Sequence, residues 1–196
     1  DTVIGDGKIL PSEFAARLSC GKISGTLFKK EFPFELTVLH SGDVTTIYSS
    51  ELQGISGSVY NDGKINFSIA EGKPLQFALS GNLKSEQLDI SVKNVKADVG
   101  KLFEYLDISR LKVYNGKLNG SLAISGLKAD PEFLGDFSLT QADFTLPKIV
   151  SQHVFVPKTQ IIFDHNKIYI PIARGYVKKP DNVICADLNV FFDRWS

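Results

Sequence analysis

The sequence predicts an all-β protein that folds as an antiparallel meander, and two features carry that prediction. Apolar and polar residues alternate with a period of two almost from end to end of the 196-residue chain, as they do in strands that bury one face. Short segments rich in Asn, Asp and Gly separate the alternating runs, and these residues form the tight turns of β-hairpins. Runs joined in this way are expected to pair with their neighbours in the chain.

The strands are expected wherever the alternation is clearest, with the apolar residues on one face and the polar residues on a solvated face. In chain order the apolar positions are Phe34, Leu36 and Val38; Ile65, Phe67 and Ile69; Leu75, Phe77 and Leu79; Leu88, Ile90 and Val92; Leu118, Leu122 and Ile124; Phe137 and Leu139; Phe144 and Leu146; and Ile168 and Ile170.

Turns are expected between these runs, because Gly and Asn reach positive φ at little steric cost. The candidate turns are residues 61–63, 80–82, 115–116 and 164–166. Asp130-Pro131 is a further expected turn, since Pro fixes φ at a value that suits the second position of a turn.

Two segments carry a helical period instead, and both are expected to be short helices on or beside the sheet. In residues 95–106, one apolar stripe is formed by Val95, Val99, Leu102, Phe103 and Leu106. In residues 11–18, Ser12 is placed to cap a turn or two of helix containing Phe14, Ala15 and Leu18.

No linker or block of charge divides the chain, so we treat residues 1–196 as a single elongated unit. A loose repeat with Gly at both ends occurs at residues 21–25, 54–57 and 116–120, which suggests a sheet extended by repeated hairpins. The chain starts at Asp1 and has no Met, so we expect a segment of a larger protein.

The composition argues against several classes of function. The 22 basic and 22 acidic residues give a formal net charge of zero, which makes nucleic acid a poor candidate partner. No run of about 20 apolar residues is present that could form a membrane-spanning helix. The two cysteines, Cys20 and Cys185, are expected to be small core residues, with a disulfide as the less favoured interpretation.

Nothing in the sequence indicates an enzyme, a metal site or a cofactor. His40, His153 and His165 lie outside metal-ligand spacing of one another and of the cysteines. No nucleophile elbow, phosphate-binding loop or dinucleotide fingerprint is present. We therefore predict no catalytic, cofactor-binding or metal-binding residues.

The apolar faces allow two architectures. A sandwich of two sheets would bury these faces against each other, and composition alone favours it because sandwiches are common. A single curved sheet would leave its apolar face open to acyl chains or to extended polypeptide.

The segment from Val113 to Pro147 resembles the repeated module of the TamB family and of the wider AsmA-like group. In that module, a Gly-x-Leu-x-Gly hairpin is followed by a Gly-ended strand, an Asp-Pro turn and a further strand. The matching residues are Gly116, Leu118, Gly120, Gly126, Asp130-Pro131, Phe133, Gly135, Leu139, Ala142 and Phe144. The resemblance covers residues 88–175 and is weak before them.

The resemblance implies an open, elongated sheet with an apolar groove, called a β-taco. It implies a periplasmic part of an inner-membrane-anchored protein that takes part in phospholipid transport to the outer membrane or in protein assembly there. The implied partners are phospholipid acyl chains or an extended β-strand client, neighbouring β repeats of the same chain and an outer-membrane assembly protein.

The resemblance therefore predicts that one apolar face lines the groove. The predicted groove-lining residues are Ile65, Phe67, Ile69, Phe77, Leu79, Leu118, Leu122, Ile124, Phe137, Leu139, Phe144, Leu146, Ile168 and Ile170. The alternative is a closed β-sandwich or solenoid that serves as a binding or adhesion module of a surface protein, with its function in loops such as 62–63 or 178–180.

Overall fold

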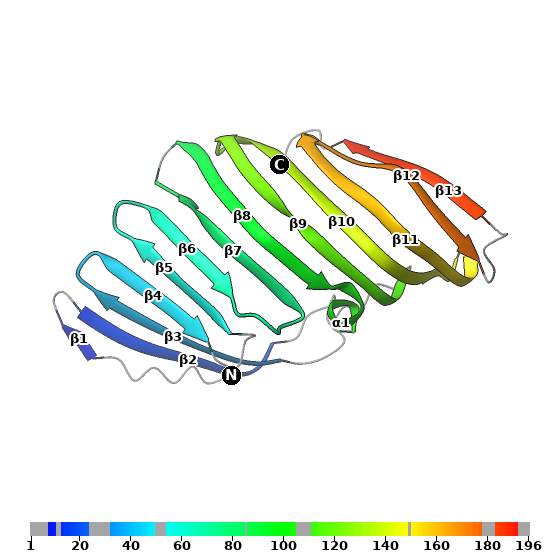
Figure 1. The fold of residues 1–196 in the computed structure, drawn as a ribbon. Coiled ribbons are helices and arrows are strands. Elements are labelled where there is room, and N and C mark those ends of the chain that lie inside the picture. The colour runs from blue at the N-terminus through cyan, green and yellow to red at the C-terminus, as the bar shows by residue number, and fades with distance from the viewer. Residues whose placement is uncertain are drawn as a thin grey trace.

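The chain folds into one antiparallel sheet of 13 strands, in which every strand pairs with its neighbours in the sequence (Figure 1). The computed structural model describes residues 8–10, 13–23, 32–49, 54–84, 86–104, 111–148, 150–177 and 183–191. The strands are β1 (Lys8–Leu10), β2 (Glu13–Ile23), β3 (Phe32–Ser41), β4 (Val44–Ser49), β5 (Ile55–Tyr60), β6 (Lys64–Ile69), β7 (Leu75–Asn82), β8 (Gln87–Asp98), β9 (Lys112–Leu127), β10 (Asp130–Leu146), β11 (Val150–His165), β12 (Lys167–Val177) and β13 (Val183–Phe191).

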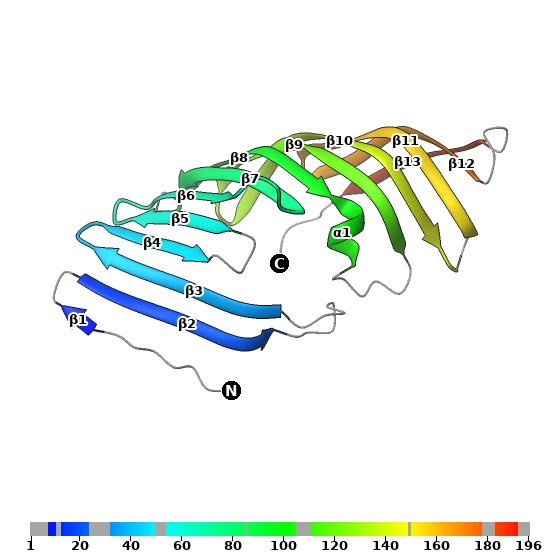
Figure 2. The same ribbon diagram turned by 60° about the horizontal axis from the view of Figure 1, so that its bottom comes forward.

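The sheet is open, because β1 and β13 lie at opposite ends of the strand order. It twists and arches along its length, and no second sheet lies against it in the described part of the chain (Figure 2). The prediction of an all-β, open antiparallel sheet is confirmed. The closed sandwich, which composition alone favoured, is wrong for the described residues.

The one described helix, α1 (Val99–Phe103), follows β8 without a break. The Asp98 side chain caps it by accepting a hydrogen bond of 3.1 Å from the backbone N–H of Lys101. The predicted helix is thus shorter than residues 95–106, because Val95 stays in β8, where it pairs with Gly120 and is buried. Leu106 lies outside the described residues.

The helix predicted in residues 11–18 is wrong. Residues 13–23 form β2, in which Ala16 pairs with Val38 and Leu18 pairs with Leu36. Phe14, Ala16 and Leu18 also fit the period of a strand, and pairing with β3 decides between the two periods. Ser12 lies outside the described residues.

The expected turns at residues 61–63 and 164–166 join β5 to β6 and β11 to β12, as predicted. The other two Gly-containing candidates are wrong. Gly81 lies inside β7, and Gly116 lies inside β9 next to a register shift. The Asp130-Pro131 turn is displaced, because the chain reverses at residues 128–129 and Pro131 already pairs with Gly126 in the ladder.

Strand length divides the sheet into two parts. β4, β5 and β6 have 6 residues each, whereas β9, β10 and β11 have 16, 17 and 16. The longer strands contain register shifts near Asn94 and Gln141, two non-glycine residues with positive φ. Such bulges increase local twist, so the long part of the sheet curves along its strands.

Candidate functional site: the apolar face of the sheet

One face of the sheet carries an unbroken row of directly paired residues that crosses every strand from β2 to β13. Directly paired residues of antiparallel strands point to the same face, so the pairing itself defines the row. We call it the central row: Ala16, Val38, Ile47, Gly57, Phe67, Leu79, Val92, Leu122, Gly135, Phe163, Ile168 and Val190.

The central row contains only apolar residues and glycine. At a strand spacing of about 4.8 Å, its length is roughly 50 Å along the sheet. The next row toward the hairpin turns contains no Asp, Glu, Lys or Arg either; it consists of His40, Thr45, Val59, Ile65, Gly81, Ile90, Ile124, Phe133 and His165. These two rows therefore carry no Asp, Glu, Lys or Arg across strands that lie far apart in the sequence, and the central row is apolar throughout.

The structure places all of the predicted groove-lining residues on this face. Phe67, Leu79, Leu122 and Ile168 belong to the central row, and Ile65 and Ile124 to the row beside it. The others lie on the side nearer α1 or the ends of the long strands: Ile69, Phe77, Leu118, Phe137, Leu139, Phe144, Leu146 and Ile170. Their role as groove lining stays a prediction.

Two glycines leave room for the largest side chains of this face, which lie over them. The ring of Phe67 lies over Gly57 on the neighbouring strand, and a Cβ atom at Gly57 would overlap that ring. Gly120 has the same relation to Phe137, whose ring would lie 2.6 Å from an added Cβ. These glycines end two of the three sequence repeats, so each of these repeats places an aromatic ring over a glycine of the adjacent strand.

Buried apolar residues gather at the α1 end of the same face. We call the packed zone the set Val95, Ala97, Phe137, Ala142, Val154 and Val156, each no more than 8% exposed. Ala142, Val154 and Val156 contact one another and pack against Leu139 and Phe144. The helix joins this region, because a Cβ atom at Gly116 would contact Val99 of α1 as well as Leu139 and Ala142 of β10.

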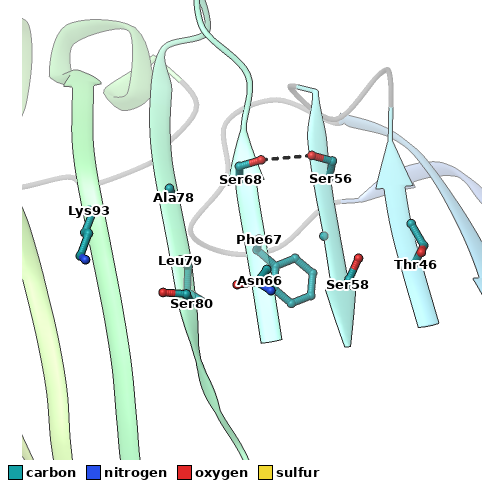
Figure 3. A pocket seen from close by; sticks show the side chains of 11 residues that line it. Thr46, Ser56, Ser58, Asn66, Phe67, Ser68, Ala78, Leu79, Ser80 and Lys93 are labelled. Atoms are coloured by element: carbon teal, nitrogen blue, oxygen red, sulfur yellow. Dashed lines mark hydrogen bonds between the residues drawn. The ribbon is translucent and has the colours of Figure 1, made fainter. Parts of the chain in front are cut away.

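The opposite face is mixed: it exposes Leu39, Tyr48 and Leu134, and a shallow hollow of about 430 Å³ opens on it over β4–β8 (Figure 3). Its lining combines polar side chains with residues of apolar character. The polar ones are Thr46, Ser56, Ser58, Asn66, Ser68, Ser80 and Lys93, and the others are Gly57, Phe67, Ala78 and Leu79. The Ser56 and Ser68 hydroxyls are hydrogen-bonded at 3.1 Å. These groups can form hydrogen bonds, but they include no carboxylate, cysteine or histidine.

The histidines lie apart from one another. His153 hydrogen-bonds Asp143 at 2.8 Å and stacks on Tyr114, with ring centroids 4.4 Å apart. His165 contacts Asp164 at 2.8 Å in the hairpin turn, and His40 contacts Thr45 at 2.9 Å. Among the described residues, no cluster of three His, Cys, Asp or Glu is arranged to hold a metal ion.

An ion pair at one hairpin rim shifts the pKa of both of its members. The Lys64 ammonium, 2.8 Å from the Asp62 carboxylate, lowers the pKa of Asp62 through a side-chain hydrogen bond, and a backbone hydrogen bond from Lys64 adds to this effect. The same pair raises the pKa of Lys64. Both groups are fully exposed in solvent, so the ion pair shapes the rim and has no bearing on the apolar face.

Cys185 corrects a further prediction. Its side chain is exposed and forms no disulfide, so it is neither a core residue nor bridged to Cys20. It lies in β13, where it pairs with Arg174 rather than facing the apolar rows.

Apart from its glycines, six members of the central row were not predicted to line the groove: Ala16, Val38, Ile47, Val92, Phe163 and Val190. Val38 and Val92 lie in runs whose alternation was clear, and Phe163 precedes a correctly predicted turn. Extending the alternation through each turn would have found them. The glycines of the row leave no such signal, because they have no side chain to mark a face.

Comparisons with known proteins identify no relative: no family model, no curated protein and no solved structure matches the chain. Within the described residues, no helix has the length and apolar character needed to cross a membrane.

Proposed function

We propose that this chain is a segment of a scaffold whose apolar face holds phospholipid acyl chains, in phospholipid transport to the outer membrane or in protein assembly there. The central row is the observation that carries the proposal: an apolar row without a charged residue, crossing every strand from β2 to β13. The resemblance of residues 88–175 to the AsmA-like module supports the same proposal and suggests a periplasmic location.

The chemistry of the face favours acyl chains as the occupant. Interior strands already pair their backbone N–H and C=O groups with both neighbours, so a polypeptide lying on this face would find few backbone partners. An acyl chain needs no such partners and gains about 0.8 kcal/mol for each CH₂ removed from water. An extended β-strand client is therefore the less favoured occupant of the face itself.

The test is the lipid content of the purified chain. After expression in a Gram-negative host, native mass spectrometry with lipid extraction should find phospholipid bound to the wild-type protein. Phe67→Asp should remove it, because a carboxylate on the central row must be desolvated by a bound acyl chain. Circular dichroism must show that the variant remains folded.

Asn66→Asp is the matched control, since it adds the same charge one position away on the polar face. It should leave the bound phospholipid unchanged. A folded wild-type chain that carries no lipid, or equal lipid loss in both variants, would contradict the proposal.

A further inference from the structure

We propose that a small hollow beside the start of β7, on the face opposite the central row, binds a phosphate group. Its polar lining consists of Lys73, Gln76, Lys96, Asp98, Lys117 and Asn119. The phosphate is carried either by free phosphate or by the headgroup of a phospholipid. The site is independent of the proposed function, which concerns the other face of the sheet.

Strand register brings the lining together from three adjacent strands. Gln76 of β7 pairs with Lys96 of β8, and Lys96 pairs with Asn119 of β9, so these side chains share one face. Lys117 is two residues from Asn119 along β9 and points to the same face. Lys96 and Lys117 are therefore diagonal neighbours, roughly 7–8 Å apart, and their long side chains can reach a single anion.

The turn before β7 is held against the end of β8, which places Lys73 at the hollow. The backbone N–H of Asp98 donates a hydrogen bond of 2.7 Å to the carbonyl oxygen of Pro74. The side-chain amide of Gln76 donates another, of 3.3 Å, to the carbonyl oxygen of Lys73. The backbone of the site is thus fixed before a ligand arrives, and only side chains have to be ordered on binding.

The charge of the hollow is unbalanced. Three lysines line it against one carboxylate, and that carboxylate is already engaged. Asp98 accepts a hydrogen bond of 3.1 Å from the backbone N–H of Lys101 and lies 3.8 Å from the Lys101 ammonium group. Within the described part of the chain, no ion pair is formed by Lys73, Lys96 or Lys117. Like charges at neighbouring sheet positions repel one another, so an anion that bridges these lysines also stabilises the sheet.

Size and chemistry favour a small oxyanion as the ligand. The hollow has a volume of about 220 Å³, below the roughly 300–1,000 Å³ of pockets that enclose drug-sized molecules. Phosphate oxygens accept hydrogen bonds from several donors at once, and lysine is a common phosphate-binding residue. The side-chain amides of Gln76 and Asn119 supply further N–H donors beside the lysines.

Titration of the full chain with inorganic phosphate, followed by amide chemical shifts in NMR spectra at constant ionic strength, tests the proposal. Saturable shifts are expected at the residues that line the hollow. The double variant Lys96→Gln/Lys117→Gln should bind phosphate about tenfold more weakly or worse, because it loses two charge-assisted hydrogen bonds. Both lysines are exposed, so the variant should fold.

Two control variants accompany this titration. Lys128→Gln removes the same charge from the turn after β9, at the far end of that strand from Lys117, and should leave the affinity for phosphate unchanged. Lys96→Arg/Lys117→Arg keeps both charges and should keep most of the affinity. Equal weakening by Lys128→Gln and by the Gln double variant would overturn the proposal, since any loss of positive charge would then be sufficient.

Vesicles distinguish the two sources of phosphate. The wild-type chain and the Gln double variant are sedimented with phosphatidylcholine vesicles that contain or lack phosphatidic acid, whose phosphate is an exposed monoester. Extra binding to phosphatidic acid that the double variant loses identifies a lipid headgroup as the ligand. Saturable binding of inorganic phosphate without that extra binding identifies free phosphate. Absence of both effects, or equal effects in wild type and double variant, would overturn the proposal.

Discussion

The short-stranded and long-stranded parts of the sheet share one apolar row but differ in how much of their surface they bury. In β4–β6, Ile65 is the only buried apolar side chain, whereas β10 and β11 contribute Phe137, Ala142, Val154 and Val156. A strand of 6 residues places only about three side chains on each face, too few to enclose one another. Stability should therefore come mainly from the long strands, while the apolar surface extends through both parts.

The largest expected effect comes from placing a charge in the packed zone. Val156→Asp buries an unpaired carboxylate at a position that is 7% exposed, and it should lower the free energy of unfolding by several kcal/mol or prevent folding. Urea unfolding followed by circular dichroism measures this loss. Lys158→Asp, on the exposed side of the same strand, should change stability little; similar losses in both variants would show that the zone is not a core.

Phe67 and Phe137 each lie over a glycine, one in the short-stranded and one in the long-stranded part of the sheet. Truncating each ring therefore compares the packing of the two parts. Phe137→Ala should lower the free energy of unfolding by about 3 kcal/mol, because the ring is 8% exposed and contacts Phe163. This loss is near the lower end of those found for Phe→Ala at buried positions. Phe67→Ala should lower the free energy of unfolding by about half as much, because the Phe67 ring remains partly exposed to solvent. Equal losses in chemical denaturation would mean that the short strands are packed as tightly as the long ones.

Because the Phe67 ring lies over Gly57, substitutions at positions 57 and 67 should have non-additive effects on stability. Gly57→Val should cost about 2 kcal/mol, because the new side chain would overlap the Phe67 ring. In a double-mutant cycle, Phe67→Ala should recover much of that loss. Ser58→Val, on the polar face of the same strand, should be close to neutral. Strictly additive losses at positions 57 and 67 would refute the contact.

The smallest effect is expected at the rim ion pair. The pKa of Asp62 is lowered in the folded state, so its ionised form stabilises the fold above the ordinary carboxyl value of 3.8. That contribution is lost as the pH falls through the lowered folded value. Asp62→Asn should therefore slightly reduce stability at neutral pH, and this reduction should shrink as the pH falls through the lowered folded pKa of Asp62. Because the pair is fully exposed, a large change in Tm at neutral pH would be unexpected.

The strands and their apolar face could be predicted from the sequence, because alternating apolar and polar side chains mark both. The turn at residues 61–63 could also be predicted, because a turn with positive φ favours glycine and Gly63 has a φ of +90°. At Gly81 the same reasoning failed, because that glycine is needed for a close approach to the Ile90 backbone within the sheet and not for a turn. Local residue type does not distinguish these two uses.

The two zones of the face could not be predicted, because their difference arises between strands. Leu118 and Leu122 look equivalent in the sequence, yet Leu118 pairs with Ala97 of the packed zone and Leu122 with Val92 of the central row. The helix shows the same limit. Val95 and Val99 share a helical stripe, but pairing with Gly120 keeps Val95 in the sheet.

The most direct test of the central claim is tryptophan quenching by phospholipids with brominated acyl chains, at two adjacent positions of β9. In a Trp195→Phe background, Leu122→Trp places the indole on the central row, and Ala123→Trp places it on the exposed polar face. Acyl chains held on the apolar face should quench the fluorescence of position 122 and leave position 123 unquenched. Equal quenching at both positions, or quenching at 123 alone, would contradict the account.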